Sequence, residues 1–163
     1  MKTKIDMSKI QKVKPFAISV ALLTFLIYLP SLKNGFVNWD DDSYIYENFF
    51  IRDIGIKLFE WAFLRFNVAN WHPLTWVSHS IDYAIWGLSP LGHHLTNNIL
   101  HAINTFIVVL LVVRLLGIVR SRGMDKGHSE SFLTERGMFI TGVTTGLLFG
   151  VHPIHVESVA WVS

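Results

Sequence analysis

The chain has 163 residues, of which 51% are hydrophobic and only 16% are charged, and it contains no cysteine. Its mean hydropathy of +0.40 is too high for an ordinary soluble domain, so we expect a membrane protein. The absence of cysteine excludes a disulfide framework, a thiolate zinc site and a cysteine nucleophile. The 14 basic and 12 acidic residues are too nearly balanced for nucleic-acid binding by charge alone.

Three apolar runs predict an all-α protein with about three transmembrane helices. The first run, residues 16–32, lacks charges and is not followed by a small-x-small cleavage pattern, which favours a retained span over a signal peptide. The second run covers residues 95–113. The third, residues 138–151, is short, and a kinked helix is expected to continue it through residues 154–162 because Pro153 is tolerated in the first turn of a new segment.

The distribution of lysine and arginine predicts the orientation of these spans. Residues 1–15 and residues 114–136 carry five basic residues each, whereas residues 33–93 carry four against seven acidic residues. Since short cytoplasmic segments are enriched in lysine and arginine, we expect the N-terminus and the loop 114–137 to be cytoplasmic. The loop 33–94 is then extracytoplasmic, and the functional site is expected on that side.

The outer loop contains two segments with helical periodicity. The first, residues 54–66, is rich in phenylalanine and tryptophan at helical spacing. The second begins at Pro73, and proline is permitted in the first turn of a helix. It has an apolar stripe of Leu74, Val77, Ile81 and Ile85, and a polar stripe of Thr75, Ser78, His79 and Asp82. We expect both helices to pack at the membrane surface.

Three consecutive carboxylates, Asp40, Asp41 and Asp42, follow the first span. Their mutual repulsion favours protonation of at least one of them, which suits a general base. The same cluster could bind a hard cation, or it could be a solvated acidic turn. The neighbouring Trp39 and Tyr44 favour a buried or interfacial position over the solvated turn.

The outer half of the second span and the end of the third span also carry polar groups. In the second span these groups share one helical face, which serves either helix-to-helix hydrogen bonding or a cavity that opens outward: His94, Asn97, Asn98, His101, Asn104 and Thr105. The third span has a face of small residues suited to close helix packing: Gly142, Gly146 and Gly150. The residues that follow it, His152, His155 and Glu157, are a weak zinc pattern and suit hydrogen bonding to a phosphate better.

Four segments of the sequence carry a family resemblance: residues 35–42, 71–76, 92–104 and 150–161. In this order and spacing they resemble the bacterial relatives of the transmembrane and tetratricopeptide-repeat O-mannosyltransferases, which belong to the GT-C superfamily of polytopic glycosyltransferases. The resemblance implies transfer of a sugar from a polyprenyl-phosphate carrier to a hydroxyl of a protein or glycan acceptor, on the outer face of a bacterial plasma membrane.

The resemblance also assigns residues. Asp40 and Asp41 match the family's paired acidic motif, which acts on the acceptor, and Asp42 is an additional neighbour. The polar residues implied in substrate binding are Asp42, His72, His94, Asn98, His101, His155 and Glu157. A carboxylate can accept the hydroxyl proton while the lipid phosphate leaves without help from an acid, so no metal cofactor is expected, although a divalent ion is compatible with the site.

Members of the family have more spans and a C-terminal repeat array, and no tetratricopeptide pattern occurs in this sequence. We therefore expect the N-terminal part of a longer transferase, whose further helices and repeats would be its partners. One alternative is a non-enzymatic membrane module that binds partner helices through the polar face of the second span. Another is a metal-binding membrane protein that uses the aspartate cluster with His152, His155 and Glu157.

Overall fold

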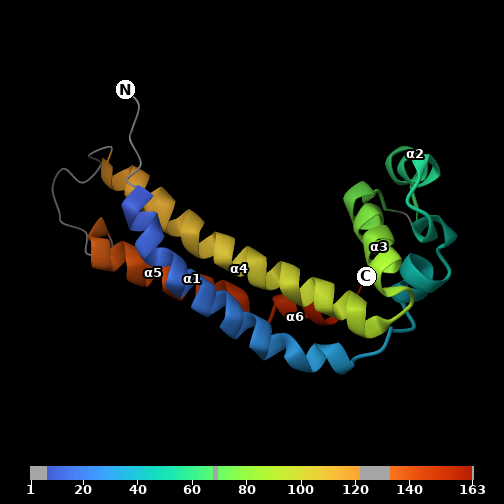
Figure 1. Ribbon diagram of the computed structural model, residues 1–163, viewed down its shortest axis with the longest axis horizontal. Helices are drawn as coiled ribbons and strands as arrows, with labels where there is room; N and C mark the ends of the chain where they lie inside the picture. Colours follow the sequence, from blue (N-terminus) through green and yellow to red (C-terminus); the bar gives the residue numbers. More distant parts are fainter. Residues whose placement is uncertain (1–6, 68–69, 122–132, 163) are drawn as a thin grey trace. The chain divides into compact units, whose positions relative to one another are not determined.

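The computed structural model describes residues 7–67, 70–121 and 133–162 (Figure 1). These residues are predominantly helical and include no β-strand beyond an isolated bridge between Asn67 and Asn70. The prediction of an all-α fold is confirmed. Part of the predicted cytoplasmic loop, including Arg122 and Lys126, lies outside the described residues.

The chain forms two compact units. The first unit contains residues 1–27 and 99–155, and the second contains residues 28–98 and 156–163. Of the three boundaries, one falls within α4 (Pro90–Ser121), which contributes residues to each unit. The other two fall at the end of α1 (Met7–Tyr28) and at the start of the short helix α6 (His155–Ala160).

The first unit is built from three apolar helices that lie side by side (Figure 1). α1 is Met7–Tyr28, α4 is Pro90–Ser121 and α5 is Glu135–Val151. α5 begins at Thr134, whose side chain accepts a hydrogen bond from the Gly137 backbone N–H at 3.0 Å and thereby caps the helix. All three predicted spans are therefore helices, and α4 is longer than the apolar run that predicted it.

Small residues let these helices approach one another closely. A Cβ atom at Gly146 would collide with the side chain of Val109 on α4 and would lie 3.5 Å from Val20 on α1. One turn further along α5, a Cβ atom at Gly150 would collide with the hydroxyl of Thr24 and lie 3.1 Å from Thr105. The glycine face is therefore a helix interface, as the sequence predicts.

Within the described residues, two segments are long and apolar enough to cross a membrane, Gln11–Lys33 and Pro90–Ser121. The first segment is α1 followed by a short 3-10 helix, η1 (Leu29–Lys33). The 17 residues of α5 extend about 26 Å, which is slightly less than a hydrocarbon core of about 30 Å. Large apolar side chains on the outer faces of the long helices are exposed, which supports membrane association.

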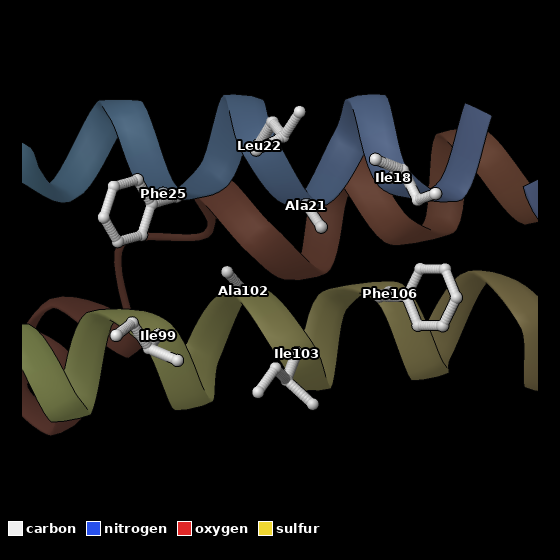
Figure 2. A pocket seen from close by; sticks show the side chains of 8 residues that line it. All are labelled: Ile18, Ala21, Leu22, Phe25, Ile99, Ala102, Ile103 and Phe106. Carbon is white, nitrogen blue, oxygen red and sulfur yellow. The ribbon is translucent and has the colours of Figure 1, made fainter. Parts of the chain in front are cut away.

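A pocket of about 470 Å³ lies between α1 and α4 in the first unit (Figure 2). Its lining is entirely aliphatic or aromatic: Ile18, Ala21, Leu22, Phe25, Ile99, Ala102, Ile103 and Phe106. Such a surface has no group with which to hold a polar ligand.

The second unit has an aromatic core. The turn η2 (Asp42–Tyr46), the 3-10 helix η3 (Phe49–Arg52), α2 (Ile56–Leu64) and α3 (Pro73–Trp86) contribute to it. Trp76 is fully buried, with its ring centroid 4.5 Å from that of Tyr44 and 5.1 Å from that of Trp61. α2 and α3 confirm the two helices predicted in the outer loop.

α3 turns its polar side inward. His79, Ser80 and Asp82 are buried, whereas Leu74 and Ile85 are 76% and 63% exposed. This orientation is the reverse of that of a helix on a soluble protein, and it suits a helix whose outer face meets lipid.

Candidate functional site

The three consecutive aspartates have different surroundings. Asp41 is fully buried, and its carboxylate accepts a hydrogen bond of 2.7 Å from the Val37 backbone N–H. Asp42 is half-buried and accepts a 2.8 Å hydrogen bond from the backbone N–H of Ser43. Asp40 is also half-buried, and its carboxylate makes no hydrogen bond to the part of the chain that the structure describes. Of the three carboxylates, Asp40 is thus the one whose oxygens are not already engaged.

Asp41 lies next to two buried histidines of the second unit. Its negative charge interacts with His79 on α3 and with His94 in the first turns of α4. His94 also lies against the Gly35 backbone, close to the start of the acidic segment. The buried Asp41 carboxylate thus accepts a backbone N–H and lies close to two imidazole rings.

A second group of polar side chains joins α3 to α4. Ligand atoms of His79, Asp82 and His93 all lie within 4.8 Å of one another, and all three residues are buried. The hydroxyl of Thr96 donates a 2.7 Å hydrogen bond to Oδ1 of Asp82. Gly87, between the helices, has a φ of 61°, a conformation that glycine adopts without strain.

Burial dominates the protonation of the two α3 members. It lowers the pKa of His79 to about 4; the nearby His93 acts in the same direction and Asp41 opposes both. Burial raises the pKa of Asp82, against the effects of the Thr96 hydrogen bond and of His93. His79 is consequently neutral at neutral pH.

The first unit holds a separate pair of histidines. Nε2 of His101 lies 3.0 Å from the carbonyl oxygen of Gly150, in the last turn of α5, so its N–H can donate to that carbonyl. The ring of His155 packs at a tilt against those of His101 and Phe149, with centroid distances of 5.1 Å and 4.6 Å. His101 thus satisfies a carbonyl that the helix end would leave unpaired, which is the helix-to-helix role among the two that the sequence left open.

The remaining predicted binding residues are scattered. Asn98 is fully buried in the second unit, while His72 and Glu157 are exposed. Asn104, which the sequence places on the same polar face of α4, is exposed. Among the polar residues of this α4 face that belong to the first unit, only His101 and Thr105 are buried.

The sequence predicts His79 and Asp82 on the polar stripe of α3 and indicates no role for His93. Their i, i+3 spacing on a helix was a signal, since residues three apart lie on one face. The third member comes from another helix, after the turn at Gly87. Only the packing of α3 against the start of α4 brings it to the other two.

The chain is similar to several animal protein O-mannosyl-transferases. Protein O-mannosyl-transferase Tmtc1 of Drosophila melanogaster is 31% identical over 150 residues, which cover 85% of this chain and 15% of the relative. Protein O-mannosyl-transferase Tmtc2 of the same species is 31% identical over 153 residues, or 86% of this chain and 14% of the relative. Protein O-mannosyl-transferase TMTC3 of Mus musculus is 32% identical over 93 residues, or 57% and 8%.

The chain therefore spans no more than 15% of the length of these curated relatives. No family model and no solved structure matches it. The two fly proteins align with most of the chain, and the resemblance inferred from the four motifs is confirmed. The chain is a relative of the TMTC protein O-mannosyltransferases.

Proposed function

We propose that this chain is the part of a membrane glycosyltransferase that activates the acceptor. In this proposal a sugar passes from a polyprenyl-phosphate donor to a hydroxyl of a protein or glycan acceptor. The names of the relatives support glycosyl transfer to protein as the general activity. The observation that carries the proposal is the contrast between Asp40, with unengaged carboxylate oxygens, and Asp41, which is buried and anchored beside it.

Each carboxylate then has a separate task. Asp40 accepts the proton of the acceptor hydroxyl while the hydroxyl oxygen bonds to the anomeric carbon of the sugar. The bond between that carbon and the lipid phosphate breaks, and the phosphate leaves with the electron pair, which inverts the configuration at the carbon. Asp41 has a positioning role. The hydrogen bond that its carboxylate accepts from the Val37 backbone N–H fixes the turn that presents Asp40.

The orientation belongs to the proposal as well. The N-terminus faces the cytoplasm of a bacterial cell, and the second unit lies on the extracytoplasmic side of the plasma membrane. The placement of basic residues supports this orientation. A polyprenyl-phosphate headgroup at the outer boundary would then lie at the level of the acidic segment.

Single cysteines test the orientation, because the natural chain has none. Glu60 on α2 and Arg120 near the end of α4 are both exposed in the structure. We expect Glu60→Cys to react with a membrane-impermeant maleimide in intact cells, and Arg120→Cys to react only after the membrane is permeabilised. The opposite pattern would place the acidic segment in the cytoplasm and contradict the proposal.

The activity itself is tested on the protein in the longest form that its gene encodes. Membranes that contain it are incubated with radiolabelled polyprenyl-phosphate mannose, the sugar named in the relatives, and label in protein is measured. We expect labelling well above that of membranes without the protein. Absence of labelling with mannose and with other polyprenyl-phosphate sugars would favour the non-enzymatic membrane module.

A further inference from the structure

The buried group formed by His79, Asp82 and His93 has no task in sugar transfer as proposed above. His79 and Asp82 stand one turn apart on α3, and His93 lies at the beginning of α4. Their exposed fractions are 5%, 5% and 0%. Side chains of this polarity are rarely buried together unless each of them has a partner.

The histidine nitrogens lack such partners within the described residues. Neither ring nitrogen of His79 has a hydrogen-bond partner, and neither does Nδ1 of His93. A buried polar group left unsatisfied costs about 1 to 3 kcal/mol. Two adjacent imidazoles whose nitrogens lack hydrogen-bond partners therefore indicate a ligand that accepts the lone pairs of these nitrogens.

The other nitrogen of His93 shows which lone pair is available. Nε2 lies 3.0 Å from the carbonyl oxygen of Gly87. Because a carbonyl only accepts, the proton of the neutral ring resides on Nε2 and leaves Nδ1 with its lone pair. This pattern, in which one ring N–H donates to a carbonyl and the other nitrogen faces inward, is the usual arrangement of a metal-binding histidine.

Asp82 is oriented in the same manner. The Thr96 hydroxyl donates to Oδ1 of Asp82 at 2.7 Å, which fixes the plane of the carboxylate. Ligand carboxylates in metal sites are held by hydrogen bonds of this kind. The group thus contains two imidazoles and one carboxylate, and both His93 and Asp82 have an orienting partner.

We propose that His79, Asp82 and His93 bind a divalent transition-metal ion, with Zn²⁺ as the best match. Two nitrogen ligands and one oxygen ligand suit zinc, whereas calcium and magnesium prefer oxygen ligands throughout. Zn–N bonds of about 2.0 to 2.1 Å in a tetrahedral site place ligand atoms about 3.4 Å apart. The present separations are within 4.8 Å, so metal binding would require the side chains to rotate slightly toward one another. Water would take the fourth position.

A metal there would tie α3 to the first turns of α4. It would also add positive charge next to His79, with which the Asp41 carboxylate interacts. This site differs from the metal site that the sequence alone suggested. That site would use the aspartate cluster together with His152, His155 and Glu157. It does not depend on the transferase proposal.

The test is metal binding by the full chain, purified in detergent through an affinity tag without histidines. The chain is dialysed against ZnCl₂ at micromolar concentration, and bound zinc is measured by mass spectrometry. We expect about one Zn²⁺ per chain, and a loss of affinity of about 100-fold or more in the variants His79→Asn and His93→Gln. The matched control is His152→Gln, whose imidazole is exposed and outside the group, and which should retain the wild-type affinity.

Two further measurements cover the case in which the ligand variants do not fold. Thr96→Val keeps all three ligands and loses only the orienting hydroxyl, so zinc affinity should fall about 10-fold to 100-fold while helical circular dichroism stays unchanged. Co²⁺ in place of Zn²⁺ should give the visible absorption of a tetrahedral site in the wild-type chain. A wild-type chain that binds no zinc, or folded His79→Asn and His93→Gln variants that bind it as the wild type does, would overturn the metal site without affecting the transferase proposal.

Discussion

Replacing Asp40 by Asn should lower sugar transfer by about 100-fold or more, which is the usual scale for loss of a general base. Asn has nearly the same shape as Asp but cannot accept the hydroxyl proton, so donor binding and folding should be preserved. The Asp40 side chain is half-buried and makes no hydrogen bond within the described residues, so its replacement removes no hydrogen bond there. The measurement is the initial rate of label transfer from a polyprenyl-phosphate sugar at saturating donor.

The neighbouring aspartates provide the comparison. Asn at position 41 can still accept the hydrogen bond from Val37, so Asp41→Asn should retain more activity than Asp41→Ala. Asp42→Asn should transfer at close to the normal rate, since its carboxylate is bonded to the adjacent Ser43. A normal rate for Asp40→Asn together with an inactive Asp41→Asn would exchange the roles of the two residues. Normal rates in both would remove the acidic pair from the mechanism.

Of the substitutions considered, replacing Gly146 by Leu should cause the largest fall in the free energy of unfolding. The helices of the first unit meet at this position, where even a Cβ atom would collide with Val109, and a leucine side chain would push α5 away from α4. Overpacking usually costs about 1 to 3 kcal/mol, and a displaced helix costs the upper part of that range or more. Thermal unfolding followed by helical circular dichroism in detergent should show a clearly lower Tm.

Gly117 offers a matched control for this change. It lies on α4, and no atom is within 4 Å of a Cβ built there. Gly117→Leu introduces the same side chain where space is open, and the better helix propensity of leucine makes the change neutral or slightly stabilising. Equal melting temperatures for the two variants would show that the glycine face of α5 is not a packing surface.

The helices could be predicted because each of them has a local signal. The apolar runs, Pro73 at the start of α3, and the four-residue spacing of the glycines are properties of short stretches of sequence. The start of α4 was harder to predict from the sequence. Pro90 and the polar first turn extend this helix beyond the hydrophobic run that marks a membrane span.

The candidate site was predictable only in part. The acidic segment was found because three adjacent aspartates stand out in the sequence, but their division into one buried, one bonded and one unengaged carboxylate depends on the turn around Val37. The pairing of His79 with His93 depends on how α3 packs on α4. Contacts between helices of this kind are set by tertiary packing, which no single periodicity encodes.

The inverted faces of α3 change how sequence variation in this helix should be interpreted. In a water-soluble protein the apolar positions of an amphipathic helix tolerate few substitutions and the polar positions tolerate many. Here Leu74 and Ile85 should exchange freely with any lipid-compatible side chain, whereas Ser80, which is fully buried, should not accept a larger residue. The fully buried Trp76 follows the ordinary rule, but a variant-effect score that ranks positions by hydrophobicity alone would misjudge Leu74, Ser80 and Ile85.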